Sequence, residues 1–441
     1  MGDKLEFMAV IDPLFLYNLL GKFSKINMTS INRDYENVLN SLECGPLLNG
    51  PSKSLSAILD KAASGAVINR EDALYLVNIE RDEIPYLLLT AAKLRDRGKG
   101  KVLTYSKNVF VPLTQICRNH CGYCTFKFEP GEGPLFMSPD EVLDLAKKGA
   151  ELGCTELLFV TGDKPELKYP VYKEALQKLG HESTADYLIA MGEAGLKENI
   201  FPHTNLGLAT SEELLGFRAS NPSMGLMLEN ISPRLLKKGE AHNRCPDKVP
   251  KLRMKTMELA GELRIPWTSG ILVGIGETWE ERIDSLLALK ELEDKYGHVQ
   301  EIILQNFSPK PGIMMEKYPP PSFIEMLKLV AISRLVFGEK MNIQIPPNLN
   351  PETYPLFIDA GINDLGGVSP VTIDYVNPEA PWPKLEIMQD MVKELGFTLR
   401  ERLPVYPEFI DNEFIDKEVL KRVVDFVDKD GYVPLEEVPN G

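Results

Sequence analysis

The sequence predicts an α/β protein whose main domain is a parallel (β/α)8 barrel of the TIM type. Three observations support this fold class: eight apolar runs of strand length follow one another, helical segments separate them, and capping signals mark where several of the helices begin. Strands that alternate with helices pair in parallel, and eight such units close into a ring. An incomplete six-stranded barrel is the alternative, because the last two strands are the least distinct.

Each predicted strand is a short apolar run between helical segments. In chain order the runs are NVFVPLT (108–114), TELLFVT (155–161), IFPHTNLG (200–207), SMGLMLE (223–229), WTSGILVG (267–274), EIILQNF (301–307), NIQIP (342–346) and INDLGG (362–367). The loops that follow these strands are expected to meet at one end of the barrel, where barrel enzymes carry their active sites.

Capping boxes mark the starts of four of the intervening helices. In this motif a Ser or Thr is followed three residues later by Glu, and each side chain bonds the other residue's backbone N–H. The pairs are Ser138 with Glu141, Thr210 with Glu213, Thr278 with Glu281 and Ser322 with Glu325. Ahead of the barrel, residues 68–77 and 85–98 have apolar residues three and four apart, which predicts two amphipathic helices.

Three segments are expected along the chain. Residues 1–65 form a mainly helical N-terminal extension, residues 66–405 the barrel domain, and residues 406–441 a helical C-terminal tail. The chain of 441 residues is long for one small domain and ordinary for a single barrel that carries extensions.

Charge and hydropathy narrow the class of protein. The formal net charge is −15, which disfavours nonspecific binding to nucleic acids. The most membrane-like stretch, residues 7–26, is interrupted by Asp12 and Pro13, so no uninterrupted run reaches the ~20 residues that span a bilayer. Acidic residues precede it where a signal peptide needs positive charge. The sequence therefore predicts a cytoplasmic protein that acts on a small molecule.

Three of the six cysteines cluster in CRNHCGYC (117–124), where Cys117, Cys121 and Cys124 have the spacing Cys-x3-Cys-x2-Cys. A structural zinc site usually has four protein ligands, whereas three cysteines leave one iron of a 4Fe-4S cluster without a protein ligand. That open iron can chelate a substrate through an amine and a carboxylate. The sequence therefore favours an iron–sulfur cluster after the first barrel strand.

Two other interpretations of the cluster remain. One is a zinc knuckle that recruits His120 or a distant residue, and the other is a dithiol motif made by Cys121 and Cys124. The third cysteine and the position after a strand disfavour both. Cys44, Cys154 and Cys245 are expected to be ordinary thiols.

The cysteine segment, with the aromatic Tyr123 before its last cysteine, resembles the signature of the radical S-adenosylmethionine superfamily. The resemblance implies that Cys117, Cys121 and Cys124 are the metal ligands and that Tyr123 contributes to the cofactor site. In that superfamily the cluster cleaves S-adenosylmethionine reductively, and a 5′-deoxyadenosyl radical abstracts a hydrogen atom from the substrate. The cofactors carry the chemistry, and the protein positions them and excludes water.

The resemblance also suggests where S-adenosylmethionine binds. Thr161, Gly162 and Asp163 end the second strand and are similar to the glycine-containing motif whose backbone receives the methionine amino group. A plain strand-to-loop turn is the alternative, since Gly and Asp favour turns. Glu229 closes the fourth strand, where a carboxylate is costly unless it meets a partner or solvent. It is expected to bind the amino group or a ribose hydroxyl, with a solvated barrel rim as the alternative.

The fifth strand continues into GILVGIGET (270–278), which is similar to the superfamily's glycine-rich segment. Gly274 is expected to let the backbone lie against the adenine, because glycine permits close approach of a flat ring. Glu277 is expected to contact the ribose, or else simply to precede the helix cap at Thr278.

Two residues are candidates for proton handling. Asp364 lies in the last strand and is expected at its end, with a loop-capping role as the alternative. His203 lies in the third strand, where it faces the lumen or has a structural role. Several other strand ends carry amides and a hydroxyl, which suit a polar heterocycle. These are Gln305, Asn306, Asn348, Asn350, Asn363 and Ser369.

Longer segments resemble one family, FO synthase subunit 1, which makes 7,8-didemethyl-8-hydroxy-5-deazariboflavin (FO) for a deazaflavin coenzyme, coenzyme F420. The resemblance covers about residues 66–405. The matching segments are PLTQICRNHCGYCTF (112–126), residues 137–166, SGILVGIGETWEERIDSL (269–286), QNFSPKPG (305–312) and DLGGVSPVTIDYVNPEAPWP (364–383).

The family resemblance implies a radical lyase. Its substrate would be the adduct of a tyrosine fragment and 5-amino-6-(D-ribitylamino)uracil, and its products FO and ammonia. The implied partners are a second radical enzyme, FO synthase subunit 2, and a low-potential electron donor. Subunit 2 itself or a menaquinone-pathway relative is the alternative among enzymes, and a zinc-stabilised binding protein is the alternative outside them.

Overall fold

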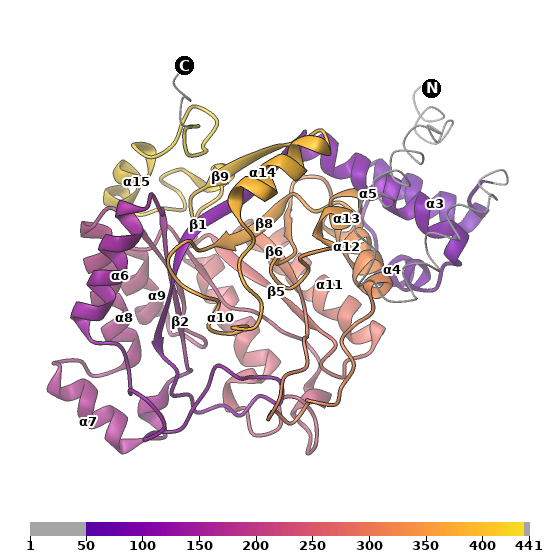
Figure 1. Cartoon of the computed structure of the whole chain (residues 1–441). Coiled ribbons are helices and arrows are strands. Elements are labelled where there is room, and N and C mark those ends of the chain that lie inside the picture. The colour runs from indigo at the N-terminus through magenta and orange to yellow at the C-terminus, as the bar shows by residue number, and fades with distance from the viewer. Residues whose placement is uncertain (1–49, 436–441) are drawn as a thin grey trace.

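The eight predicted strands form a closed parallel barrel (Figure 1), which confirms the predicted fold class. The structure is a computed structural model that describes residues 50–435. Neighbouring strands pair in the order β2-β3-β4-β5-β6-β7-β8-β1, and pairing of β1 with β2 closes the ring. The six-stranded alternative is wrong, because β7 and β8 both pair within this ring.

The eight barrel strands, β1 to β8, overlap the predicted runs; β1 is longer than predicted, and β4 is shortened the most. The strands are β1 (Val102–Thr114), β2 (Glu156–Thr161), β3 (Phe201–Asn205), β4 (Ser223–Gly225), β5 (Trp267–Val273), β6 (Val299–Asn306), β7 (Asn342–Gln344), β8 (Asp364–Val368) and β9 (Thr398–Arg402). Beyond β4, a single bridge between Glu229 and Ile271 keeps the chain beside β5. The chain after β4 therefore follows the barrel wall without regular pairing.

Helices surround the barrel (Figure 1). They are α3 (Lys53–Ala63), α4 (Arg70–Val77), α5 (Ile84–Lys99), α6 (Pro139–Glu151), α7 (Pro170–Lys178), α8 (Thr184–Lys197), α9 (Ser211–Arg218), α10 (Pro250–Glu262), α11 (Trp279–Tyr296), α12 (Phe323–Phe337), α13 (Tyr354–Asp359), α14 (Leu385–Glu394) and α15 (Lys417–Val424). Short 3-10 turns are η2 (Arg81–Glu83), η3 (Pro165–Leu167), η4 (Pro233–Leu236), η5 (Pro246–Lys248) and η6 (Pro407–Phe409). All four predicted capping boxes are present, at the starts of α6, α9, α11 and α12.

The N-terminal helices pack on the barrel domain rather than apart from it. In α3, Leu55, Ile58 and Leu59 are buried in the same hydrophobic cluster as the barrel strands. Figure 1 shows α3 beside α5 on the outside of the barrel. The first 49 residues, including the stretch 7–26, lie outside the described part of the chain. Between residues 50 and 435, no helix has the length and apolar character needed to cross a membrane.

A ninth strand, β9, was not predicted. It pairs in parallel with the first residues of β1, from Val102 to Ser106, and Figure 1 shows it there beside α14. Its sequence TLRER has too few apolar residues for a strand signal, so only its pairing with β1 identifies it. After β9 the chain crosses the start of the barrel, where the carbonyl oxygen of Pro404 accepts hydrogen bonds from Ser223 and Gln300. This C-terminal strap, residues 398–406, closes the end of the barrel at which the strands begin.

Candidate active site

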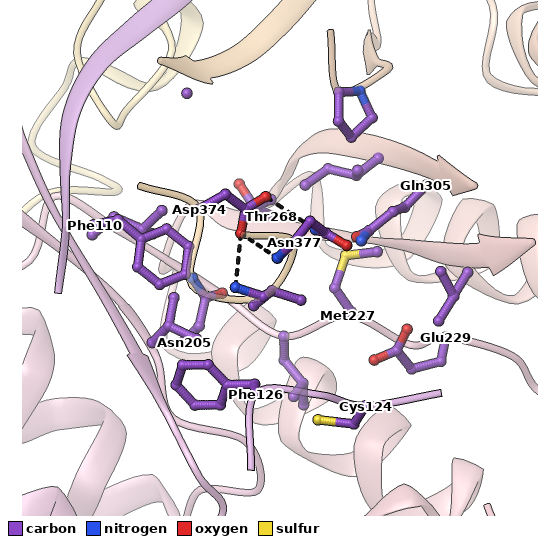
Figure 2. A pocket seen from close by; sticks show the side chains of 18 of the residues that line it. Phe110, Cys124, Phe126, Asn205, Met227, Glu229, Thr268, Gln305, Asp374 and Asn377 are labelled. Atoms are coloured by element: carbon purple, nitrogen blue, oxygen red, sulfur yellow. Dashed lines mark hydrogen bonds between the residues drawn. The ribbon is translucent and has the colours of Figure 1, made fainter. Parts of the chain in front are cut away.

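A cavity of about 410 Å³ occupies the barrel lumen. One end is formed by the loops that follow the strands, and Cys117, Cys121 and Cys124 line it there. The other end lies toward the starts of the strands and is closed by the C-terminal strap. Figure 2 shows Cys124 and Glu229 facing the same cavity as Asp374 and Asn377.

The cysteine loop is held in place by contacts from the opposite wall of the barrel. Arg118 forms a bidentate ion pair with the fully buried Asp247. The backbone N–H of Gly122 donates to Ala241, and that of Met315 donates to the carbonyl oxygen of Gly122. Since these partners come from different loops, the positions of the thiols depend on the closed barrel.

Gly162 allows the cysteine loop to approach β2. A Cβ at Gly162 would lie 1.9 Å from the carbonyl oxygen of Ile116, so any side chain would displace that loop. The backbone N–H of the next residue, Asp163, donates to Cys117 Sγ at 3.2 Å. Thr161 and Gly162 also line the cavity. The segment predicted to bind the methionine amino group therefore also supports one of the three cysteines.

Cys245 lies closer to the cysteine cluster than the sequence indicated. Its Sγ atom is 3.6 Å from Cys121 Sγ and donates a hydrogen bond to it. Nothing in the spacing of the two residues, 124 positions apart, signals this contact. Cys154 is buried elsewhere, against the carbonyl oxygen of Asn108, as expected of an ordinary thiol.

Asp163 lines the cavity and has a buried carboxylate oxygen without a partner. Its Oδ1 atom has no hydrogen-bond partner, although the residue is only 6% exposed. Burial, reinforced by the neighbouring charge of Asp247, raises the pKa of Asp163 to about 7. An unpaired buried acceptor is costly, so this oxygen has the surroundings of a group that binds a donor from a ligand.

Glu229 lies beside two cations that the sequence did not single out. It accepts a hydrogen bond from Lys248 Nζ at 2.6 Å and adopts a left-handed backbone with φ of 64°. Burial raises the pKa of Glu229, but Lys248 and Arg253 outweigh that effect, so the net shift is downward. Glu229, Lys248 and Arg253 all line the cavity, which gives this wall one carboxylate and two cations.

Tyr123 also lines the cavity, next to the cysteines. Its hydroxyl lies 3.1 Å from His242 Nε2, and the two rings pack edge to face. Burial lowers the pKa of His242 to about 3, so the imidazole is neutral. The contact orients the Tyr123 ring.

Gly274 and Glu277 do not line the cavity. Both carboxylate oxygens of Glu277 accept backbone N–H groups, from Gly274 and Ile275, and one also pairs with Arg282 at 2.6 Å. The Glu277 side chain is fully buried by these partners. It thus braces the loop after β5, while Leu272 and Phe307 supply the cavity surface nearby.

The two candidates for proton handling occupy different places. His203 lines the cavity from the middle of β3. Asp364 does not, and the expectation that it lies at the strand's end is corrected: it is the first residue of β8, at the opposite end from the cysteines. Its carboxylate pairs with Arg402 and accepts from Thr104, with no surface exposed to solvent.

The amide residues predicted at strand ends also fall into two groups, those that line the cavity and those that do not. Gln305, Asn306 and Asn348 line the cavity. Asn363 instead bonds Arg334 and the backbone of Ile343, so its role is structural. A sequence pattern predicts that a residue lies near a strand end, but not whether the chain has already used its hydrogen-bonding groups.

Three cavity residues at the closed end carried no sequence signal. Glu156 begins β2, Glu301 lies near the start of β6, and Arg402 comes from the unpredicted β9. Barrel enzymes carry their active sites at the carboxyl ends of the strands. Site residues were therefore not expected at the starts of the strands.

The donor set at the cysteine end fits an iron–sulfur cluster that binds an amino acid at its open iron. Three thiols line one wall, an unpartnered carboxylate oxygen of Asp163 is available for an amine, and Lys248 is available for a carboxylate. Within residues 50–435, no three His, Cys, Asp or Glu side chains converge closely enough to hold a single metal ion. A cluster makes a different demand, because each thiolate binds a separate iron.

Comparisons with known proteins agree with this geometry. Residues 111–289 match the family described as the Radical SAM superfamily. A 7,8-didemethyl-8-hydroxy-5-deazariboflavin synthase from Methanopyrus kandleri is 47% identical, over 75% of this chain and 99% of that protein. An FO synthase from Streptomyces avermitilis is 42% identical, over 86% of this chain but 45% of that longer protein. Among solved structures, HydG, a maturase of the [FeFe]-hydrogenase, superimposes with a TM-score of 0.68 at 17% identity, over 93% of this chain and 84% of that one, a likeness of fold alone.

Proposed function

The chain belongs to the 7,8-didemethyl-8-hydroxy-5-deazariboflavin (FO) synthase family of radical S-adenosylmethionine enzymes, and from this we propose that it catalyses the ring-closing half of FO formation. The substrate is the adduct of a tyrosine-derived fragment and 5-amino-6-(D-ribitylamino)uracil. The products are FO and ammonia, so the enzyme is a carbon–nitrogen lyase and corresponds to FO synthase subunit 1. The observation that carries the proposal is a set of three thiols and a free carboxylate oxygen at one end of the barrel cavity.

Cys117, Cys121 and Cys124 are the proposed ligands of the 4Fe-4S cluster. When bound, the cluster and S-adenosylmethionine supply the carbon-centred radical that abstracts hydrogen from the substrate. The protein's part is to hold the three thiols in one geometry, through the Arg118–Asp247 ion pair and the amide of Asp163. Hydrogen bonds to the cluster's sulfur atoms also tune its potential, a role open to that amide and to the thiol of Cys245.

Asp163 and Glu229 are the proposed binding groups for the amino-acid part and ribose of S-adenosylmethionine. Asp163 Oδ1 is unpartnered and suits the amine, while Lys248 beside Glu229 suits the carboxylate. Tyr123, Thr161 and Gly162 line the same part of the cavity. Gly274 and Glu277 are proposed to act indirectly, because they shape the loop after β5 without lining the cavity.

Enclosure is the second requirement of radical chemistry, because water and dioxygen quench reactive intermediates. The segment 369–383 covers part of the cavity, and Asp374 and Asn377 within it line the wall. Asp374 accepts hydrogen bonds from the side-chain amides of Asn348 and Asn377, which ties this segment to the loop after β7. Lys310 adds two bonds, to Val376 and Asn377. The covering segment is thus fixed by buried hydrogen bonds.

A second radical enzyme, subunit 2, is the proposed supplier of the adduct. The chain spans 45% of the Streptomyces FO synthase, which leaves more than half of that protein unmatched. The described cavity has one cysteine triad, so one radical reaction is assigned to this chain. Production of the adduct is accordingly proposed to be the reaction of a second radical site, that of subunit 2.

Electrons are proposed to come from an acidic, low-potential donor protein that docks beside the cysteine loop. Lys127 and Lys168 lie within hydrogen-bond distance of His120, three residues after Cys117, and Arg244 adds a third charge. Burial and then these three cations lower the pKa of His120. A group of cations on a chain of net charge −15 favours an acidic partner at this face.

The direct test is an anaerobic assay of the reconstituted protein with S-adenosylmethionine, a strong reductant and the product of subunit 2. FO is expected, detected by its fluorescence, together with ammonia and 5′-deoxyadenosine in equal amounts. Formation of FO by subunit 2 alone would contradict the proposal. Consumption of free tyrosine by this protein in the absence of the adduct would assign it to the subunit 2 reaction instead.

A further inference from the structure

The closed end of the cavity carries polar groups that the chemistry at the cysteines does not use. We call this group the floor: Asn108 from β1, Glu156 from β2, His203 from β3, Glu301 from β6 and Arg402 from β9, all of which line the cavity. Register shows that Asn108 lies directly beside Glu156, which begins its strand. In a parallel barrel the strand starts share one end, so the floor lies opposite the cysteine loop.

Asn108 is the clearest sign that a ligand reaches the floor. Its Nδ2 and Oδ1 atoms both lack a hydrogen-bond partner, although the residue is only 1% exposed. Space for this amide comes from Gly367 on β8, where a Cβ would lie 2.0 Å from Asn108 Nδ2. A buried amide with neither its donor nor its acceptor satisfied is rare unless a bound molecule completes it.

His203 offers an acceptor to the cavity. Ser223 Oγ donates to the carbonyl oxygen of Pro404 at 2.7 Å, so it must accept from His203 Nδ1, which lies 2.8 Å away. Burial lowers the pKa of His203 to about 3, so the ring is neutral and its proton is on Nδ1. His203 Nε2 is therefore left with a lone pair.

The two glutamates add acceptors and exclude anions. Glu156 accepts from Ser106 through one oxygen, and its other oxygen is without a protein partner that the structure records. Glu301 accepts from Tyr406 and Thr268, and Arg402 is shared between it and Asp364. Glu301 and Asp364 thus pair with one guanidinium, and Glu156 lies close enough to interact with the same charge, so carboxylates outnumber cations at this end of the barrel. An anionic ligand such as a phosphate would face repulsion here.

The floor atoms that lack a protein hydrogen-bond partner indicate, by elimination, which kind of ligand the floor binds. Glu156 and His203 need a donor, whereas the Nδ2 of Asn108 needs an acceptor. An ammonium group can only donate, and a phosphate accepts but is repelled. A hydroxyl group both donates and accepts, so a chain of several hydroxyls satisfies all three residues.

We propose that the floor is a binding subsite for a neutral polyhydroxyl chain, anchored by Asn108, Glu156 and His203. This inference rests on the proposed function where it identifies that chain as the ribityl arm of the substrate. With the arm on the floor, the uracil and phenol rings lie between it and the cysteine end, so the arm fixes the orientation of the rings that close. Asn108, Glu156 and His203 are positioning residues in this arrangement.

Binding of FO tests the subsite without turnover. The reconstituted protein, with S-adenosylhomocysteine present, is titrated with FO and with an N10-pentyl analogue that lacks the hydroxyls. FO is expected to bind about 100-fold more tightly, because the analogue leaves buried polar groups unpaired. Equal binding of the two ligands by a protein that forms FO would overturn the subsite and leave the proposed function intact. A preference for FO in a protein that forms no FO would support the subsite and contradict the proposed function.

Single-residue variants then show which residues cause the preference for FO over the pentyl analogue. Asn108→Ala and Glu156→Gln are each expected to reduce the FO preference at least tenfold, and Gly367→Ala to do so by crowding the Asn108 amide. The matched control is Glu293→Gln, a partly buried carboxylate on α11 that lies outside the cavity and accepts from the backbone N–H of Val299. It is expected to keep the preference.

A second pair of ligands distinguishes hydroxyl from amine recognition. 5-Amino-6-(D-ribitylamino)uracil and its counterpart without the 5-amino group are expected to lose the same factor in the Asn108 and Glu156 variants. If the loss followed the amino group and not the hydroxyls, the floor would be an ammonium site and the proposal would be wrong. Unchanged FO preference in all three cavity variants, each with native cluster content and melting temperature, would overturn it as well.

Discussion

Arg402 and Asp364 form a buried bidentate ion pair at the end of the barrel opposite the cysteines. Arg402 Nε lies 2.7 Å from Asp364 Oδ2 and Nη2 lies 3.1 Å from Oδ1, with 5% and 0% of the two side chains exposed. The pair joins β9 to β8 and so fastens the C-terminal strap across the barrel. It also explains why Asp364 is not available for proton transfer.

Asp364→Asn is therefore expected to lower stability. Removing one partner of a buried pair costs about 3–5 kcal/mol when the other charge is left uncompensated, and Glu301, 3.3 Å from Arg402, is expected to keep the loss at the lower end of that range. Urea unfolding followed by circular dichroism measures the loss. If the variant kept native stability but its FO formation fell a hundredfold, Asp364 would instead have a role in the reaction.

Replacing any one of Cys117, Cys121 or Cys124 by Ala is expected to abolish 5′-deoxyadenosine formation, because each is a proposed cluster ligand. Wild-type protein reconstituted anaerobically is expected to contain about four irons and four sulfides per chain. Cys154→Ala is the matched control, since Cys154 is a buried thiol away from the cavity. Stoichiometric zinc without iron would end the radical assignment.

Asp163→Asn is expected to weaken S-adenosylmethionine binding by about tenfold or more, because a charge-assisted hydrogen bond becomes a neutral one. The backbone N–H that bonds Cys117 is unchanged in this variant, so the iron content is expected to stay at the wild-type level. Equilibrium dialysis measures the affinity, and iron analysis supplies the control. Full affinity in the variant would show that the free oxygen of Asp163 serves another group.

Lys168→Glu and Arg244→Glu are expected to slow turnover with a flavodoxin or ferredoxin at least tenfold, because reversed charges weaken an electrostatic encounter. Both residues are exposed and outside the cavity lining. With dithionite as reductant the rate is expected to match the wild type. Equal slowing with both reductants would mean that the change damages the site rather than the docking surface.

Glu293 predicts a pH dependence of stability. Burial raises its pKa from 4.5 to about 7 in the folded chain, so the folded state holds a proton that the unfolded state has released between these values. Stability associated with this group is present below about pH 4.5 and is lost as the pH rises to about 7, by up to ~3 kcal/mol. Glu293→Gln is expected to flatten that part of the profile and to be more stable than wild type at pH 8. Parallel profiles would contradict this.

Much of the barrel followed from the sequence, because its signals are local. Apolar runs and capping boxes depend on residues within a few positions of one another, and seven of the eight runs form strands close to where they were expected. β4 is the exception: only Ser223–Gly225 is regular strand, and the chain then follows β5 through a single bridge at Glu229. The cysteine spacing is equally local, and it predicted the loop that lines one end of the cavity.

Only the tertiary structure decided which distant segments of the chain are in contact. TLRER carries no strand signal of its own, so β9 exists only through its pairing with β1, and with it come Arg402 and the strap. Asp364, Glu277 and Asn363 have the residue types of a site, yet other parts of the chain already use their hydrogen-bonding groups. Asn108 has a partner-free amide in a strand that looked merely apolar. Whether a buried polar group is satisfied or free depends on neighbours hundreds of residues away, and no local pattern records it.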